Sequence, residues 1–447
     1  MFFPKGKRHL LALALALALA LAVDVSGPAC TLAQPAWTAQ ASDPIALGWM
    51  QGSPPPPDRI IRFADGTYRS FPQWRWSVCH FQQLMPTTPV SRGLGAPRPL
   101  ERAPRADIET VRFTPTGATE PMTFMEAFDR NFTDGIVILH EGRIAYERYA
   151  GCLSEQNRHA AMSVTKSLIG LLSEILIAEG TLDESRRVDS YVPELAASAF
   201  GDATVRQVLD MTTGLEFSED YADPSADVWR HAMAGNPLPK PADYAGPRNY
   251  YEYLVTVRRS GAHGAAFGYK TVNTDAMGWI LSRVTGRPVG DLLAERIWSR
   301  IGADLEAYFT VDSIGTPFAG GGFNGGLRDL ARIGQLFLDG GMVDGVAVVP
   351  EAALNSIRRG GSRSAFAQAG YSQLAGWSYR SMWWVTHNKN GAFMARGVHG
   401  QSLYVDPTAH VVIARFASHP EAGNAANDPT TLPLYQAIVD RLQDSTR

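Results

Sequence analysis

The stretch 163–180 constrains the fold more than any other part of this sequence. It reads SVTKSLIGLLSEILIAEG, and its leucines and isoleucines would cover most of the circumference of a helix. A helix that is apolar nearly all round is buried inside a protein. Gly180 stands where a C-terminal cap is expected, because glycine commonly ends helices. The sequence therefore predicts an interior helix that the rest of the chain must surround.

The first turn of this helix carries Ser163 and Lys166. Residues three apart share a helical face, so the serine oxygen and the lysine nitrogen can meet there. The positive end of the helix dipole favours a serine alkoxide, and partial burial lowers the pKa of a lysine. This arrangement suits an activated serine nucleophile. The alternative is that Ser163 merely caps the helix and Lys166 is an exposed first-turn residue.

Lysine is rare in this chain, which has six lysines against 35 arginines, and Ser163–Lys166 is its only S-x-x-K sequence. A lysine can lose its proton at a functional site, whereas an arginine effectively cannot. The net charge of −3 contains no long runs of one sign, so nothing indicates a nucleic-acid surface. At 447 residues with 45% hydrophobic content, the chain can bury a large core.

Residues 1–33 are interpreted as a secretory signal peptide, with a basic start and a 14-residue apolar run at 10–23. This run is too short for a comfortable membrane span. We therefore expect an exported protein, periplasmic or secreted, without stable membrane insertion after signal cleavage. Cys79 and Cys152 then remain. In an oxidising compartment they could pair, or they could be two buried thiols.

Residues 34–105 are rich in proline and in aromatic side chains. Proline runs favour an extended chain, and the aromatics indicate that the segment packs on something. We expect an N-terminal arm wrapped over the main domain. Residues 59–63 and 67–71 could form a small hairpin about Asp65-Gly66.

The main domain is expected at 106–447. Segments with strand character lie near both of its ends, at 135–139, 143–149, 382–384, 402–405 and 411–416. Helices are expected at 124–128, 205–211, 277–284, 327–338 and 434–442. This pattern predicts an α+β fold, an α/β sandwich with one antiparallel sheet flanked by helices, and a helical and loop insertion at about 181–320 that holds the active site. The acidic, aromatic segment 215–264 is a candidate lid or insertion, and 320–326 a flexible glycine turn.

Two other places carry candidate chemistry. Tyr269 could act as a general acid or base if nearby cations lower its pKa from about 10. The segment 397–402 runs from glycine into a strand, where a backbone N–H could join that of Ser163 in holding an oxyanion. Taken singly, Tyr269 could be a core tyrosine, and 397–402 an ordinary glycine turn with His399 on the surface.

Together these motifs resemble the serine β-lactamase and penicillin-recognising superfamily, and more narrowly the class C β-lactamase-related hydrolases. The most similar of these are the 6-aminohexanoate-dimer hydrolases, which cleave the linear amide of nylon oligomers. The resemblance covers roughly residues 107–440. It is carried by Met162–Ser167, Met211–Leu215, Phe217–Tyr221, Tyr269–Asp275 and Val398–Gln401.

The resemblance implies a role for each matching residue. Ser163 would attack the carbonyl, Lys166 would receive its proton, and Tyr269 would relay a proton to the leaving group. The backbone N–H groups of Ser163 and Gln401 would hold the oxyanion, and Tyr221 would close over the substrate. The remaining substrate-binding candidates in these motifs are Asn273, His399 and Gly400. No metal and no organic cofactor is implied.

Two departures from class C β-lactamases matter. Thr271 stands where their Tyr-x-Asn motif has asparagine, and Val398-His399-Gly400 replaces Lys-Thr-Gly. Losing that lysine removes a cation for the carboxylate of a β-lactam. We therefore expect a small-molecule linear amide or ester as substrate. The alternatives are a carboxylesterase, a β-lactamase or D-Ala peptidase, and a non-catalytic peptide-binding protein. A homodimer stays open, as does attraction of a substrate ammonium by the acidic loop residues Glu219, Asp220, Asp223 and Asp227.

Overall fold

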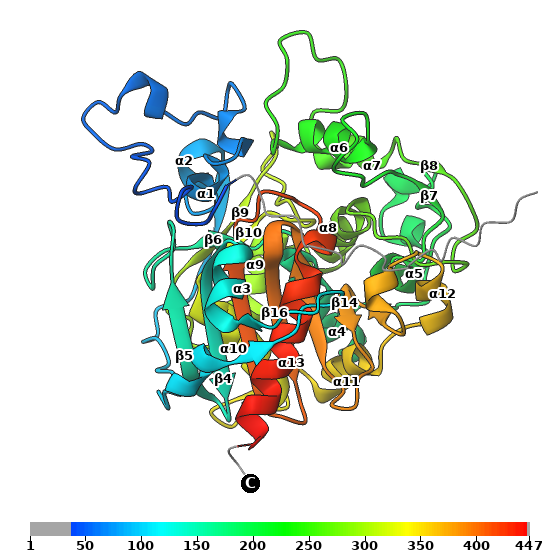
Figure 1. Ribbon diagram of the computed structural model, residues 1–447. Helices are drawn as coiled ribbons and strands as arrows, with labels where there is room; N and C mark the ends of the chain where they lie inside the picture. Colours follow the sequence, from blue (N-terminus) through cyan, green and yellow to red (C-terminus); the bar gives the residue numbers. More distant parts are fainter. Residues whose placement is uncertain (1–36, 445–447) are drawn as a thin grey trace, which may run out of the picture.

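A seven-stranded antiparallel sheet forms the centre of the computed structural model, which describes residues 37–444 (Figure 1). Its spatial order is β13-β14-β15-β16-β17-β4-β5, so the last strand in the sequence, β17, pairs with the early strand β4. The strands are β4 (Thr133–His140), β5 (Arg143–Tyr149), β13 (Ser378–Arg380), β14 (Trp383–Val385), β15 (Phe393–Gly397), β16 (Gln401–Asp406) and β17 (Val411–Ala417). The predicted α+β fold, with one sheet built from both ends of the main domain, is confirmed.

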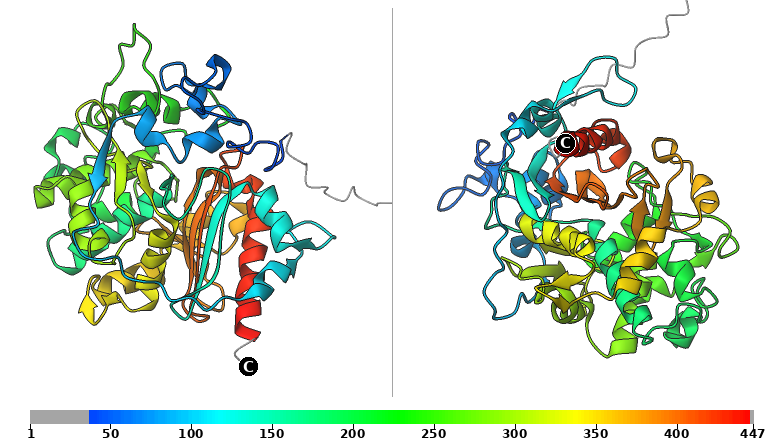
Figure 2. Two further views of the ribbon diagram at one scale, coloured as in Figure 1. Left: turned by 90° about the vertical axis from the view of Figure 1, so that its left-hand side faces the viewer. Right: turned by 90° about the horizontal axis from the view of Figure 1, so that it is seen from below.

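Helices cover both faces of this sheet, as the edge-on view in Figure 2 shows. The helices α4 (Val164–Ala178) and α10 (Leu327–Leu338) pack on one face, and α3 (Phe124–Arg130) and α13 (Asp428–Asp444) lie on the other. The others are α1 (Trp74–Ser77), α2 (Phe81–Leu84), α5 (Val205–Leu209), α6 (Asp227–Gly235), α7 (Tyr250–Leu254), α8 (Val272–Thr285), α9 (Val289–Leu293), α11 (Glu351–Arg359) and α12 (Arg363–Ala367). No helix between residues 37 and 444 is long and apolar enough to cross a membrane.

A second sheet has the order β1-β9-β10-β6 and joins the N-terminal segment to the body of the molecule. Its strands are β1 (Thr87–Val90), β6 (His159–Ala160), β9 (Ala307–Thr310) and β10 (Phe323–Gly325). Three short pairs complete the structure: β2 (Arg112–Phe113) with β3 (Met122–Thr123), β7 (Leu215–Glu216) with β8 (Arg258–Arg259), and β11 (Met342–Val343) with β12 (Val346–Ala347). The glycine-rich segment 320–326, expected as a flexible turn, instead contributes the buried strand β10.

The closing helix α13 begins at Asp428, six residues before the expected start at Leu434, and Pro433 lies inside it. A proline has no N–H for the carbonyl four residues earlier. Here that carbonyl, of Pro429, accepts a hydrogen bond from Thr116 N at 2.8 Å. The Pro429 carbonyl, which has no donor within the helix, is therefore hydrogen-bonded by a residue distant in the sequence.

The interior helix α4 is fixed to the sheet by close backbone contact at Gly170. A Cβ built on this glycine would lie 1.9 Å from the carbonyl oxygen of Ser381, in the turn between β13 and β14. Ser167 Oγ donates to Met382 O at 2.6 Å, and Trp383 Nε1 donates to Ser167 O at 2.9 Å. Every residue of α4 up to Leu176 is buried, as the apolar pattern predicts.

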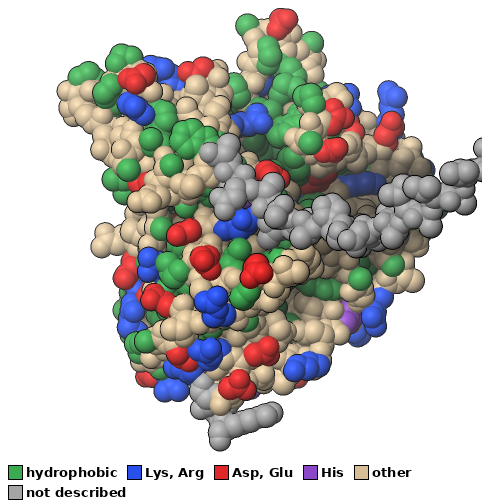
Figure 3. Space-filling model, in the orientation of Figure 1, with side chains coloured by type: hydrophobic (Ala, Val, Ile, Leu, Met, Phe, Trp, Pro, Cys, Tyr) green, Lys and Arg blue, Asp and Glu red, His purple; other side chains and the backbone are tan. Residues whose placement is uncertain are grey.

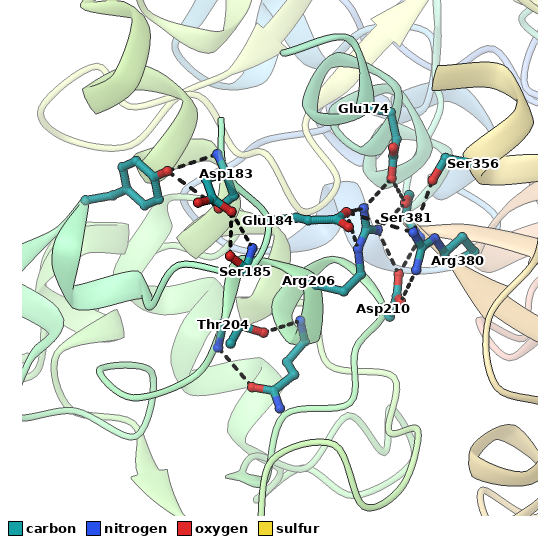
Figure 4. Close-up of polar contacts among 12 residues, drawn as sticks. Glu174, Asp183, Glu184, Ser185, Thr204, Arg206, Asp210, Ser356, Arg380 and Ser381 are labelled. Atoms are coloured by element: carbon teal, nitrogen blue, oxygen red, sulfur yellow. Dashed lines mark hydrogen bonds and ion pairs between the residues drawn. The ribbon is translucent and has the colours of Figure 1, made fainter. Parts of the chain in front are cut away.

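A network of charged side chains fastens the same turn to the far end of α4 (Figure 4). Arg206, on α5, contacts the Glu174 carboxylate at 2.8 Å and that of Asp210 at 3.2 Å. Ser381 N donates to Asp210 at 3.0 Å, and Ser381 Oγ donates to Glu174. Arg380 pairs with Asp210 at 3.0 Å. These bonds give the buried carboxylates partners that offset their desolvation.

The segment 37–90 packs against the body through a small aromatic core of its own. Trp49, Tyr68, Trp74, Trp76 and Phe81 are buried there, together with Cys152, Ala160 and Tyr308 of the body. The prediction of a hairpin from 59–63 and 67–71 is wrong, because the chain forms two 3₁₀ turns at 57–59 and 67–69. Asp65 accepts hydrogen bonds from both N and Oγ1 of Thr67, which starts the second turn where a strand was expected.

Two buried links secure this segment. Arg75 Nη2 contacts Asp134 Oδ1 at 2.9 Å with both side chains excluded from solvent, and Arg75 Nε donates to Ser418 Oγ at 3.1 Å. Cys79 and Cys152 form a disulfide with a Cα–Cα distance of 6.1 Å. The two cysteines are therefore paired and are not two buried thiols.

The disulfide closes a long loop, since its cysteines are 73 residues apart in sequence. Closing a loop of this length restricts the unfolded chain strongly. We expect the double variant Cys79→Ser/Cys152→Ser to lose about 2–4 kcal/mol of unfolding free energy. Urea denaturation of the oxidised protein and the variant measures this. The reduced wild type should match the variant, and unchanged stability in both would contradict the prediction.

Candidate active site

Ser163 lies at the N-terminus of α4, directly after a strained residue. Met162 has a φ of 46°, a conformation that costs energy for a non-glycine side chain. Ser163 is the N-cap residue, yet its side chain makes no capping hydrogen bond. The interpretation as a simple helix cap therefore fails, and the hydroxyl is left for another partner.

That partner is Lys166, one turn along α4. Its Nζ lies 2.8 Å from Ser163 Oγ and donates to the Gly320 carbonyl at 2.5 Å. Lys166 is 1% exposed, so the alternative of an exposed lysine is wrong. Burial lowers the pKa of Lys166 to about 8, against the opposing effect of the carboxylates of Glu219 and Asp275. A neutral amine is therefore accessible near physiological pH and can accept the serine proton.

Tyr269 completes this group from the loop before α8. Its ring centroid lies 5.2 Å from Lys166 Nζ, and it lines the same cavity as Ser163. Trp384 stacks on the ring with centroids 5.5 Å apart. Burial, reinforced by the Glu219 carboxylate, raises the pKa of Tyr269 well above 10. This differs from the expectation that a nearby cation lowers it, so Tyr269 remains a phenol able to donate a proton.

Glu219 lies at the site, whereas the sequence placed it in an acidic loop with a possible role in attracting a substrate ammonium. Its carboxylate accepts hydrogen bonds from Thr271 N and Thr271 Oγ1, both at 2.6 Å, and from Tyr221 OH at 2.9 Å. It thereby ties the segment 215–221 to the start of α8. The sequence signal for this contact is Thr271, which stands where class C β-lactamases have the asparagine of Tyr-x-Asn. Its hydroxyl can donate to a carboxylate such as that of Glu219.

Two cavities meet at Ser163. The apolar cavity, of about 350 Å³, lies between the N-terminal segment and α6, and its walls include Trp74, Phe81, Trp229 and Phe318. The polar cavity, of about 480 Å³, lies on the other side of Ser163. It is lined by Glu219, Tyr269, Tyr371, Trp384, Arg396 and Asp428 among others. Tyr221 and Val398 line both cavities, so each borders the position of the reacting carbonyl.

Three predicted site residues are not brought to these cavities. Asn273 is fully buried in the first turn of α8, where its Oδ1 accepts from Thr213 Oγ1 at 2.7 Å. Gln401, whose backbone N–H was expected to hold the oxyanion, begins β16, and its side chain donates to the Ala417 carbonyl and accepts from the Ala417 N–H. The Gly400 carbonyl accepts from Arg415 Nε at 3.0 Å. None of the three lines either cavity.

The backbone segment that lies beside Ser163 is Gly397 and Val398, at the end of β15, and not Gly400 and Gln401. A Cβ built on Gly397 would lie 2.9 Å from Ser163 N and 2.8 Å from Ala161 O, so only glycine fits there. His399 lines the apolar cavity, where burial lowers its pKa to about 4 and its Nδ1 lies 2.7 Å from His419 O. It is therefore a neutral wall residue.

Arg396 corrects the expectation that this strand end lacks a cation. It directly precedes Gly397, is 6% exposed and lines the polar cavity. Its guanidinium pairs with Asp428 and lies 5.1 Å from the Trp384 ring centroid. Arg396 lies two residues before Val398–Gly400, the segment that stands in place of Lys-Thr-Gly. Among residues 37–444, no group of three or more His, Cys, Asp or Glu side chains is placed to hold a metal ion.

A buried Ser-Lys pair at the start of a helix against an antiparallel sheet, with a half-buried Tyr beside it, defines a class of serine hydrolases, and comparison with known proteins identifies the family. The β-lactamase family model matches residues 131–436. The 6-aminohexanoate-dimer hydrolase of Paenarthrobacter ureafaciens is 36% identical over 357 residues, 79% of this chain and 88% of that protein. The chain belongs to the β-lactamase family, and it is a hydrolase of the 6-aminohexanoate-dimer hydrolase type.

Solved structures agree with this assignment. A Bacillus anthracis protein assigned as a 6-aminohexanoate-dimer hydrolase has a TM-score of 0.78 and 29% identity, covering 86% of this chain and 97% of its own. EstCE1, a hydrolase with promiscuous acyltransferase activity, has a TM-score of 0.56 at 16% identity. It covers 71% of this chain and 96% of its own, and at this identity it shares the fold alone.

Proposed function

We propose that the protein hydrolyses small linear amides or esters through an acyl-enzyme on Ser163. The observation that carries this proposal is the 2.8 Å contact between Ser163 Oγ and the buried Nζ of Lys166, placed where the two cavities meet. A serine next to a base of suitable pKa is an activated nucleophile. A cavity on each side of the serine suits a linear substrate with a group on both sides of its carbonyl.

In this mechanism Lys166 takes the Ser163 proton as Oγ attacks the carbonyl carbon. The oxyanion is held by the backbone N–H of Ser163 and, in place of that of Gln401, by the N–H of Val398. The Gly397 backbone beside Ser163 N supports this assignment. Tyr269 gives its phenolic proton to the leaving nitrogen or oxygen and takes back the proton that Lys166 received from Ser163. Water then attacks the acyl carbon and loses a proton to the neutral Lys166, and the Ser163 oxygen leaves and regains a proton from Lys166.

The closest alternative within this chemistry is a carboxylesterase, since acylation of serine uses the same residues for either leaving atom. A β-lactamase or D-Ala peptidase is disfavoured, because the one arginine lining the polar cavity within residues 37–444 is already paired with Asp428. A non-catalytic peptide-binding protein has no need of a buried lysine with a pKa of about 8 beside a serine. Closure of Tyr221 over the substrate remains part of the proposal.

We also propose that the protein is exported, to the periplasm or outside the cell. The Cys79–Cys152 disulfide supports this, because disulfides persist mainly in oxidising compartments. The proposed signal peptide, residues 1–33, lies outside the described residues. We keep the division into an arm at 34–105 and a hydrolase domain at 106–447, with an insertion at about 181–320, and a homodimer stays open.

Intact-protein mass spectrometry during turnover of a 4-nitrophenyl ester tests the function. We expect a mass increase equal to the acyl group in the wild type, and neither this adduct nor turnover in Ser163→Ala. The loss of kcat should be about 10³-fold or more. Ser167→Ala, one turn further along α4 with its hydroxyl bound to Met382 O, is the matched control and should still acylate. Equal turnover in Ser163→Ala would refute the mechanism.

A further inference from the structure

The two cavities hold different halves of the substrate. Tyr269, the proton donor in the proposed mechanism, lines the polar cavity and is absent from the apolar one. The leaving group must lie within reach of that donor. The leaving half therefore occupies the polar cavity and the acyl half the apolar cavity. This assignment rests on the proposed function.

The apolar cavity carries a single charged side chain of the described part of the chain, Arg69. The two histidines in its wall do not add a free cation. His399 is neutral because its pKa is lowered to about 4, and His231 lies 2.9 Å from the Asp275 carboxylate. An acyl chain in this cavity thus meets apolar walls and one guanidinium.

Arg69 comes from the 3₁₀ turn at 67–69 and is exposed. Its guanidinium lies over the Trp229 ring of α6, 4.7 Å from the centroid, and so spans from the N-terminal segment to the opposite wall. Figure 3 shows hydrophobic side chains gathered in the hollow between these two parts. No Asp or Glu within residues 37–444 forms an ion pair with Arg69, unlike Arg396, which is paired with Asp428.

We propose that Arg69 is a specificity residue that favours acyl groups ending in a carboxylate over acyl groups ending in an ammonium. A planar guanidinium with unused donors recognises a carboxylate well, and it repels an ammonium. The stacking on Trp229 holds its plane in place without neutralising its charge. A hydrolase with this cavity is suited to half-amides or half-esters of dicarboxylic acids.

The linear 6-aminohexanoate dimer fits this charge pattern poorly. Its acyl half ends in an ammonium, which would face Arg69, and its leaving half ends in a carboxylate. The polar cavity contains the Glu219 carboxyl group, and Arg396 is already paired with Asp428. The ammonium end of the dimer therefore meets a group of like charge, and the carboxylate end meets an arginine that is already neutralised by Asp428. This also opposes the hypothesis that the acidic loop residues Glu219, Asp220, Asp223 and Asp227 attract a substrate ammonium.

Three 4-nitrophenyl esters with six-carbon acyl groups test the proposal: the hydrogen adipate, the hexanoate and the 6-aminohexanoate. They share a leaving group and differ only at the far end of the acyl chain. We expect wild-type kcat/KM to be about tenfold higher for the adipate than for the 6-aminohexanoate. Arg69→Gln should bring this ratio close to one, and Arg69→Glu should invert it. The hexanoate should change little in either variant.

Arg59→Gln is the matched control, because Arg59 also lies over a tryptophan, Trp49, at 5.3 Å, but lines neither cavity. It should keep the wild-type ratio. If the hexanoate is hydrolysed and the adipate preference is absent or insensitive to Arg69, the inference is wrong while the proposed function stands. If no ester is hydrolysed and none acylates Ser163, the proposed function fails and the inference with it.

Discussion

Replacing Lys166 by methionine is expected to lower kcat by about 10³-fold while changing KM little, because it removes a general base and leaves the cavities intact. Methionine has a similar length and no proton acceptor, so the buried site stays filled. Lys166→Arg should be equally inactive, since a guanidinium keeps its proton. Ester hydrolysis under saturating substrate measures kcat, and single-turnover acylation locates the lost step.

Lys240→Met is the control for the loss of a lysine with a lowered pKa. Burial lowers the pKa of Lys240 too, but it bonds Asn236 Oδ1 and lines neither cavity. Its substitution should leave kcat within about twofold of wild type. A Lys166→Met enzyme that acylates at the wild-type rate would remove Lys166 from the mechanism.

The same lysine sets the pH dependence. Its folded pKa is about 8, lowered from 10.5, and only the neutral amine accepts the Ser163 proton. In the free enzyme, kcat/KM should therefore rise with pH and level off above about 8. Tyr269 must stay protonated to donate, and because its pKa is raised well above 10, it adds no falling limb below pH 10. A rate that is flat from pH 6 to 9 would contradict this role.

Gly170→Ala is expected to destabilise the protein by about 3 kcal/mol or more, a large effect for one methyl group. The added Cβ would lie 1.9 Å from the Ser381 carbonyl oxygen, a backbone atom that cannot rotate away. The Glu174, Arg206 and Asp210 network holds that turn in place, so it resists relaxation (Figure 4). Chemical denaturation followed by circular dichroism measures the loss.

Gly290→Ala is the matched control, because Gly290 also lies within a helix, α9. There the nearest atom to an added Cβ is Thr88 Cγ2 at 3.6 Å, an ordinary contact. Alanine is the better helix former, so this variant should be unchanged or stabilised by up to about 1 kcal/mol. Equal effects of the two substitutions would show that α4 does not depend on close approach at Gly170.

Comparison of sequence and structure shows which inferences depend on local pattern. The apolar helix 163–180 and the strands at 135–139, 143–149, 402–405 and 411–416 are predicted nearly to their ends, because periodicity reports which faces are buried. The start of α13 was missed at Pro433, since the sequence alone does not reveal that Thr116 serves the Pro429 carbonyl. The strand at 323–325 was missed because its glycines resemble a turn until β9 and β6 pair with it.

The sequence by itself determined the Ser163–Lys166 contact, because helical geometry brings residues three apart together whatever surrounds them. Tertiary structure decided the rest of the site. The burial that lowers the pKa of Lys166, the approach of Gly397 and Val398 in place of Gln401, and the meeting of Glu219 with Thr271 all join segments remote in the chain. Such contacts follow from how sheet and helices pack, which no local pattern encodes.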